Sequence, residues 1–438
     1  MRGVRVLPPR LNPLFAALTT LLGVTVPAAL AAPVPAHAAG GCPAGVRVPA
    51  GQRITGVPWA QVRYQPELLA GVADGSGVTV AVIDSGVDAA HPQLRRAVLR
   101  GRDFLPGGTG GDGRTDCVAH GTAVASIIAA APVPGTGFAG LAPGARILPI
   151  RVTETSDTAT GGRAGTAAGL AQAITAAVRD GARVLNISMA LYRDDPRVRQ
   201  AVRDAVRAGA VVVAAAGNAH DAAAGTDPVP YPAGYPDVLG VGAVDENGQR
   251  LDASQVGSYV DIVAPGSAVT AAVPAGGLGY FTGTSFAVPF VSATAALLLS
   301  RYPRPAAESD LSTVRTVTAR ITGSADPAPD SVPGTNYGHG VLNPYRAVAE
   351  VPPPPGLSAA PPAPGTGRQT VAAADRRTGA LRMAGMAAGA AALVLVFTAV
   401  LARGNRRRWR PGRMCGETGP ARGDGPARSA PADGRAVR

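Results

Sequence analysis

Short apolar runs alternate with longer helix-like segments through the middle of the chain. The short runs are almost continuously apolar, as is typical of parallel strands buried on both faces, and they cover residues 78–83, 146–150, 184–187, 211–214 and 238–241. The helix-like segments between them cover residues 122–131, 166–179 and 197–208. This alternation predicts an α/β fold in which a parallel sheet carries helices on both faces. In such sheets, functional residues gather at the carboxyl ends of the strands.

Polar residues interrupt this apolar pattern at three places. Asp84 ends the first predicted strand, His120 stands just before a predicted apolar helix, and Ser285 stands at the start of another. Taken singly, they fit a turn, a histidine satisfied near a helix terminus and a helix N-cap. Taken together, they fit the three roles that a serine nucleophile requires. The serine hydroxyl needs a general base, imidazole titrates in the neutral range, and a carboxylate fixes the imidazole tautomer.

The segments around these residues resemble the three signatures of the subtilisin-like serine proteases. They read V-A-V-I-D-S-G at 80–86, H-G-T-A-V-A-S at 120–126 and G-T-S-F-A-V-P at 283–289. The order Asp, His, Ser is also the order of that family, and the resemblance covers roughly residues 55–350. It implies a subtilisin-like fold, with Asp84 orienting the imidazole, His120 as general base and acid, and Ser285 as the acyl-accepting nucleophile.

The resemblance extends to the oxyanion hole and to the substrate cleft. Asn218 ends the segment A-A-A-G-N and corresponds to the family's oxyanion-binding asparagine, although a Gly-Asn turn is an alternative. Substrate contacts fall on six residues: Ser188, Met189, Ala190, Ala215, Ala216 and Gly217. The resemblance implies that residues 188–190 pair with the substrate backbone and that residues 215–217 form the facing wall of the pocket for P1, the substrate residue whose carbonyl is attacked. The small, apolar side chains of that wall indicate a medium-sized, uncharged P1 residue. Ala190 replaces the family's usual glycine and indicates a narrow cleft, while plain strand packing remains an alternative for all six residues.

Two apolar runs near the ends of the chain indicate its location. Residues 1–38 combine three arginines, an apolar stretch and a small-x-small cleavage signal, so they are interpreted as a signal peptide, with an uncleaved anchor as the alternative. Residues 383–402 are long and apolar enough to span a membrane, with a buried core helix as the alternative. Because arginines follow that run, residues 403–438 are predicted to be a cytoplasmic tail and the catalytic domain to be extracytoplasmic. Gly385 and Gly389 form a G-x-x-x-G pattern, a weak indication of helix packing.

Composition changes this picture little. Hydrophobic residues make up 46% of the 438 residues, which excludes global disorder. The net charge of +12 suggests nucleic-acid binding, but +7 of it lies in residues 403–438 and +3 in residues 1–13. The folded part is therefore nearly neutral, and no nucleic-acid role is predicted. The sequence also offers no metal-ligand spacing and no cofactor motif, so neither a metal nor a cofactor is predicted.

Cysteine usage points to a narrower group within the family. Cys42 and Cys117 lie in the extracytoplasmic part and allow one disulfide, with two free thiols as the alternative, while Cys415 lies in the predicted tail. Residues 39–76 are too few for a separately folded propeptide and are expected to wrap the peptidase domain, residues 77–350. A Pro-rich linker follows at residues 351–382. This organisation resembles the mycosins, the membrane-anchored subtilases associated with type VII secretion, although their frequent second cysteine pair is absent.

The resemblance implies a membrane-anchored extracytoplasmic serine endopeptidase that acts by an acyl-enzyme mechanism near a type VII secretion pore. Its implied partners are protein or peptide substrates, including type VII secreted proteins, together with the membrane and membrane proteins of the secretion complex. One alternative is a scaffold that stabilises that complex without needing proteolysis. The other is an envelope quality-control protease, which would cleave unfolded proteins broadly.

Overall fold

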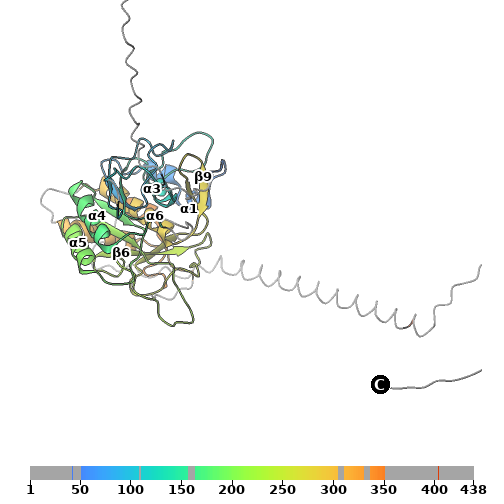
Figure 1. Cartoon of the computed structure of the whole chain (residues 1–438). Coiled ribbons are helices and arrows are strands. Elements are labelled where there is room, and N and C mark those ends of the chain that lie inside the picture. Colours follow the sequence, from blue (N-terminus) through green and yellow to red (C-terminus); the bar gives the residue numbers. More distant parts are fainter. Residues whose placement is uncertain are drawn as a thin grey trace, which may run out of the picture. The chain divides into compact units, whose positions relative to one another are not determined.

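The computed structural model describes residues 51–107, 110–155, 163–303, 310–329 and 336–350, together with Cys42 and Arg403 (Figure 1). The chain divides into two units, Met1–Pro352 and Pro353–Arg438. Of the second unit only Arg403 is described. The predicted signal peptide, the linker, the membrane helix at 383–402 and the rest of the predicted tail therefore lie outside the described residues, and their assignments stay predictions.

A seven-stranded parallel sheet forms the centre of the first unit, in the order β2-β3-β1-β4-β5-β6-β7. Its strands are β1 (Thr79–Asp84), β2 (Arg102–Asp103), β3 (Arg146–Arg151), β4 (Val184–Ile187), β5 (Val211–Ala215), β6 (Val238–Val244) and β7 (Ile262–Pro265). The central strands β1, β4 and β5 are almost wholly buried, which explains their continuous apolar runs. A separate antiparallel hairpin joins β8 (Val269–Ala272) to β9 (Leu278–Phe281).

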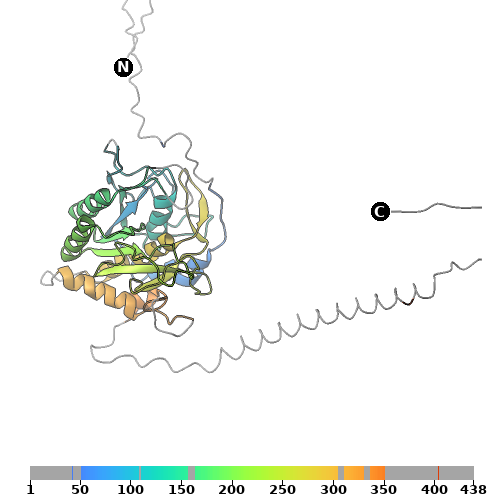
Figure 2. The same ribbon diagram turned by 60° about the horizontal axis from the view of Figure 1, so that its bottom comes forward.

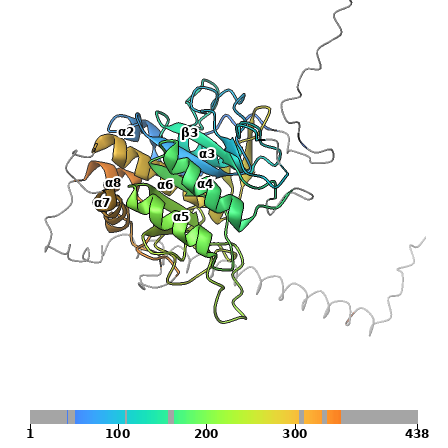
Figure 3. The same cartoon turned by 60° about the vertical axis from the view of Figure 1, so that its left-hand side comes forward.

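Helices cover both faces of the sheet. They are α1 (Trp59–Tyr64), α2 (Pro66–Ala70), α3 (His120–Ala129), α4 (Ala167–Arg179), α5 (Pro196–Arg207), α6 (Thr284–Arg301), α7 (Asp310–Gly323) and α8 (Pro344–Ala349). Figure 3 shows α4 and α5 side by side, and in Figure 2 these green helices lie across the strands from the teal α3 and the gold α6. The predicted subtilisin-like architecture of a parallel sheet between two helical layers is therefore confirmed.

Helix α6 is the one described helix that is long and apolar enough to cross a membrane. It has 18 residues, but 89% of its apolar window is buried inside the folded unit, against β4, β5, β6 and β7. Its apolar character on all sides is that of a core helix, because the sheet and its neighbouring helices surround it. This helix therefore says nothing about the membrane span predicted at residues 383–402.

The start of α3 differs from the sequence-based expectation. The apolar pattern predicts a helix from Thr122, whereas α3 begins at His120, so this histidine belongs to the first helical turn. The reason lies upstream, where the Asp116 carboxylate accepts hydrogen bonds from the backbone N–H groups of Val118, Ala119 and Thr122. Because the capping group stands three residues before the usual N-cap position at Ala119, rules of local capping do not find it.

Part of the residue 39–76 segment lies along the folded unit. The backbone of Gln52 pairs with Leu278 of β9, and the indole of Trp59 donates to the Ser267 carbonyl. The Tyr64 ring packs edge-on against Phe290 of α6, with ring centroids 5.5 Å apart. These contacts join the segment to elements that lie more than 200 residues later in the chain.

Candidate active site

The structure brings Asp84 and His120 into direct contact. Asp84 is the last residue of β1 and 3% exposed, and His120 is the first residue of α3. The Nδ1 atom of His120 lies 2.7 Å from Oδ1 of Asp84, which also accepts the Ser85 backbone N–H at 2.7 Å. An ionised carboxylate only accepts hydrogen bonds, so Nδ1 carries the ring proton. This arrangement directs Nε2 away from Asp84, as a general base requires.

A buried carboxylate that sequence reasoning missed holds this pair in place. Asp116 accepts the Ser85 hydroxyl at 2.9 Å on Oδ1, and Oδ2 accepts the Thr122 hydroxyl at 2.6 Å. The Ser85 hydroxyl oxygen in turn accepts the Gly121 N–H at 2.9 Å. Burial raises the pKa of Asp116, while these hydrogen bonds act in the opposite direction. Asp116 therefore links the residue after Asp84 to the two residues after His120.

The third predicted residue, Ser285, lies at the start of α6. It is the second residue of that helix and 8% exposed. Its hydroxyl donates to the backbone carbonyl of Ser188 at 2.9 Å, and the Ser188 hydroxyl donates back to the Ser285 carbonyl at 3.3 Å. The next residue, Phe286, places its ring 4.9 Å from the His120 ring, centroid to centroid. Helices α3 and α6 are thus packed together near their first turns, which carry His120 and Ser285.

Asn218 follows β5 and faces the start of α6. Its Oδ1 atom accepts both the backbone N–H and the hydroxyl of Thr284, each at 2.9 Å, so the orientation of the amide is defined. The Nδ2 atom faces Gly283, where a β-carbon would come within 3.2 Å of it. Gly283 has φ of 139°, a value that favours glycine. The amide nitrogen therefore lies beside the chain that leads into Ser285, as expected of a donor to an oxyanion.

Replacing Asn218 by leucine is expected to lower kcat for peptide hydrolysis by about 10²–10³-fold with little change in KM. The reason is that the donated hydrogen bond strengthens only when the carbonyl oxygen gains charge in the transition state. Steady-state kinetics on a chromogenic peptide measure both constants. Asn247→Leu, in an exposed turn, is the matched control. Equal kinetics in the two variants would contradict the predicted role of Asn218 as an oxyanion donor.

The six predicted cleft residues continue two neighbouring strands. β4 and β5 pair up to Ile187 and Ala214, and beyond that point lie residues 188–190 and 215–217. Met189 and Ala190 are partly exposed, whereas Ser188, Ala215 and Ala216 are buried. The methyl group of Ala216 packs in a small apolar cluster with Tyr259 and its neighbours. The side chain of Ala216 is therefore part of the interior packing, which was the alternative to a substrate contact.

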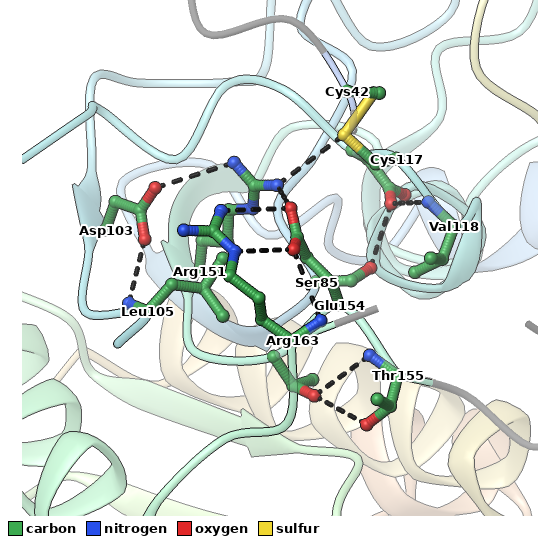
Figure 4. A network of polar contacts seen from close by, with 12 residues as sticks. Cys42, Ser85, Asp103, Leu105, Cys117, Val118, Arg151, Glu154, Thr155 and Arg163 are labelled. Atoms are coloured by element: carbon green, nitrogen blue, oxygen red, sulfur yellow. Dashed lines mark hydrogen bonds and ion pairs between the residues drawn. A yellow bond between two sulfur atoms is a disulfide. The ribbon is translucent and has the colours of Figure 1, made fainter. Parts of the chain in front are cut away.

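The predicted disulfide joins Cys42 to Cys117 and lies beside a buried cluster of charges (Figure 4). Arg151, at the end of β3, donates to the Cys117 sulfur at 3.5 Å and pairs with Asp103 and with Glu154. Glu154 has a fully buried side chain and also accepts two hydrogen bonds from the Arg163 guanidinium and one from its backbone N–H. The bond from Arg163 is the main reason why the pKa of Glu154 is lowered.

This cluster is joined to the two segments that position Asp84 and His120. Arg151 is the register partner of Asp84 across β1 and β3, and the Val152 N–H donates to the Asp84 carbonyl. Cys117 stands three residues before His120. The cluster and the disulfide thus hold the strand end that carries Asp84 and the loop that leads to His120. No local sequence pattern marks the cluster, since Asp103, Arg151 and Arg163 come from separate segments.

Comparison with known proteins gives consistent matches. The model of the subtilase family matches residues 75–340, more than half of the chain. Thermitase from Thermoactinomyces vulgaris is 36% identical over 280 residues, which cover 63% of this chain and 90% of that protein. Subtilisin NAT from Bacillus subtilis subsp. natto is 38% identical over 229 residues, which cover 52% of this chain and 57% of that protein.

Among solved structures, the chain resembles the MycP3 protease from the type VII (ESX-3) secretion system, with 34% identity and a TM-score of 0.57. That match covers 69% of this chain and 91% of the other. MycP1 from Mycobacterium smegmatis matches with 30% identity and a TM-score of 0.56, covering 72% of this chain and 93% of the other. The predicted resemblance to subtilisin-like proteases and to mycosins is therefore confirmed.

Proposed function

The chain belongs to the subtilase family of serine endopeptidases and is related to the mycosins, and from this premise we propose that it is a membrane-anchored, extracytoplasmic endopeptidase of type VII secretion. The observation that carries the catalytic part is the 2.7 Å contact between His120 and Asp84, beside the helix start that bears Ser285. A serine nucleophile, a base in the correct tautomer and an orienting carboxylate are the parts that acyl transfer needs.

Acylation follows from this arrangement. The Ser285 hydroxyl turns from the Ser188 carbonyl toward Nε2 of His120. Its oxygen attacks the substrate carbonyl carbon, and its proton passes to Nε2. Asp84 stabilises the imidazolium that forms, because its carboxylate accepts the hydrogen bond from Nδ1–H. The negative charge on the former carbonyl oxygen is received by the Asn218 amide and by the Ser285 backbone N–H at the start of α6. His120 then gives the proton to the leaving amine as the C–N bond breaks, and an ester on Ser285 remains.

Deacylation uses the same groups in reverse roles. Water gives a proton to His120 and attacks the ester carbonyl, and the same oxyanion donors receive the charge. Collapse of this intermediate breaks the bond to the Ser285 oxygen, which recovers its proton from the imidazolium. The acid product leaves and the free enzyme is restored. Every proton in the cycle is handled by His120, so activity is expected only where the imidazole is neutral.

The cellular part of the proposal rests on the ends of the chain and on the relatives. The pattern of residues 1–38 is that of a signal peptide, and residues 383–402 have the length of a membrane span. A disulfide such as Cys42–Cys117 is typical of proteins outside the cytoplasm. The solved relatives are described as proteases of type VII secretion systems. Together these features support an enzyme held at the outer face of the membrane, acting on secreted proteins.

Labelling with a fluorophosphonate tests the catalytic part. The full-length chain, purified from membranes in detergent, is expected to take up the probe, and the Ser285→Ala chain is expected to take up none. Fluorophosphonates react only with a serine that a general base has activated, so labelling reports the assembled site without knowledge of the substrate. A folded wild-type chain that resists the probe would overturn the assignment of an active serine.

A secretion assay separates proteolysis from a scaffold role. A host that lacks this protein is complemented with wild type, with Ser285→Ala, or with a chain lacking residues 383–402. Loss of type VII secretion or of substrate processing with Ser285→Ala supports the endopeptidase. Normal secretion and processing with Ser285→Ala, together with loss of secretion when residues 383–402 are deleted, would favour the scaffold instead.

A further inference from the structure

The proposed function places the P1 side chain in a slot between the chain segments that follow the paired parts of β4 and β5. These two strands are neighbours in the sheet, and past their last paired residues, Ile187 and Ala214, the chain continues as residues 188–190 on one side and 215–217 on the other. The end of the slot nearest the nucleophile is marked by Ser188, whose carbonyl accepts the Ser285 hydroxyl. On this premise a P1 side chain would enter beside Ser188 and run between these two segments.

Tyr192 crosses the far end of this slot. It follows the 188–190 segment, and its hydroxyl lies 2.9 Å from the position that a β-carbon on Gly217 would occupy. A tyrosine from one wall of the slot thus reaches the backbone of the other wall. The residue before it, Leu191, exchanges two backbone hydrogen bonds of 2.8 Å with Tyr231, so the chain that carries Tyr192 is held in place. The ring itself is 47% exposed and lies at the surface.

Gln255 fixes the tyrosine in this position. The Tyr192 hydroxyl donates to Oε1 of Gln255 at 2.8 Å, and Gln255 is fully buried. The Gln255 amide nitrogen donates to the Pro228 carbonyl at 2.8 Å, and its backbone N–H donates to the Gly217 carbonyl at 3.0 Å. A β-carbon on Gly217 would overlap Oε1 of Gln255, so this position accepts only glycine. The side-chain amide is therefore immobilised, and the tyrosine with it.

We propose that Tyr192, positioned by Gln255, closes the P1 slot and restricts the enzyme to small P1 residues such as alanine, serine or glycine. This inference rests on the proposed function and narrows the medium-sized P1 residue that the sequence indicates. An aromatic P1 side chain would have to displace the tyrosine and leave the buried Gln255 oxygen without its hydroxyl partner. An unpaired buried acceptor is costly, so large residues are disfavoured beyond the effect of shape alone.

Paired peptide substrates that differ only in alanine or phenylalanine at P1 test the selectivity. Full-length wild type is expected to favour P1 alanine, and Tyr192→Ala is expected to raise the phenylalanine-to-alanine ratio of kcat/KM at least about tenfold, as the filling of an enlarged apolar pocket does. Tyr192→Phe keeps the ring and should shift the ratio less. Gln255→Met, which removes the acceptor, should shift it in the same direction as Tyr192→Ala. Tyr345→Ala, at a half-exposed tyrosine of α8, is the matched control and should leave the ratio unchanged.

A binding measurement keeps this inference separate from the proposed catalysis. In the Ser285→Ala chain, product peptides ending in alanine or phenylalanine occupy the slot without any reaction, and isothermal titration calorimetry measures their affinities. Preference for the alanine peptide, reversed by Tyr192→Ala, supports the closed slot even if the wild-type serine resists fluorophosphonate. Equal ratios in Tyr192→Ala and Tyr345→Ala, a wild-type preference for phenylalanine, or no binding of either peptide would overturn it.

Discussion

Alanine at Ser285 is expected to lower kcat/KM for peptide hydrolysis by about 10⁶-fold, the magnitude characteristic of subtilisin-type triads. The substitution removes the hydroxyl that forms the acyl-enzyme, and the remaining rate comes from the oxyanion donors and from substrate binding. Hydrolysis of a chromogenic peptide by the full-length chain in detergent measures the loss. Ser258→Ala, at an exposed serine, is the matched control and should retain the wild-type rate.

The double variant sharpens this test. His120→Ala should cost about as much as Ser285→Ala, and the two together should cost little more, because nucleophile and base act as one unit. Additive losses would show that the two residues act independently and would contradict the triad. The wild-type rate should also rise with pH through the neutral range as imidazole loses its proton, whereas the residual rate of His120→Ala should lack this step.

Alanine at Glu154 is expected to lower the free energy of unfolding by about 3–5 kcal/mol. Glu154 is fully buried and pairs with Arg151 and Arg163, and its removal leaves the largely buried Arg151 guanidinium with Asp103 as its remaining carboxylate partner among the described residues. Urea denaturation of the purified chain measures the change. Glu246→Ala, at an exposed glutamate, is the matched control and should change stability by less than about 0.5 kcal/mol.

The pH dependence of this effect has a definite sign. The hydrogen bond from Arg163 lowers the pKa of Glu154 in the folded chain, so the folded state holds the ionised form more strongly than the unfolded state does. The stabilisation is therefore present above the unfolded pKa of about 4.3 and is lost as pH falls through the lower folded value. The stability gap between wild type and Glu154→Ala should narrow on acidification from pH 6 to about pH 3. A gap that is constant over this range would contradict the ion pairs.

The described elements differ in how far sequence alone predicts them. β4 lies at the predicted residues, and β1, β3, β5 and the helices α4 and α5 lie within one residue of them at each end. The apolar pattern predicts these elements because each of them buries a run of its own residues. The short strand β2 and the short helix α8 carry no comparable run, and the sequence pattern does not predict the hairpin of β8 and β9 either.

In the candidate site, too, sequence alone predicts the residues that lie in short motifs but not the residues that hold them in place. Asp84, His120, Ser285 and Asn218 stand in short motifs at strand or helix ends, which makes them recognisable without coordinates. Asp116 lies only four residues before His120 in the sequence. Its role in holding the Asp84–His120 pair depends on a hydrogen bond from Ser85, which is 31 residues away. The contact between Tyr192 and Gln255 spans 63 residues, and it supports our proposal of a small rather than a medium-sized P1 residue.

By itself, the sequence determined the α/β class, the order of the main strands and helices, and the four residues proposed for acyl transfer. Each of these depends on apolar periodicity or on neighbours within a few residues. Only the tertiary structure decided the support around them: the Asp116 cap, the Arg151–Glu154 cluster and the Tyr192–Gln255 closure. The residues of these contacts come together because the strand order β3-β1-β4-β5 places the ends of strands that are distant in sequence side by side. The pattern of apolar residues along one chain does not show which strand ends become neighbours.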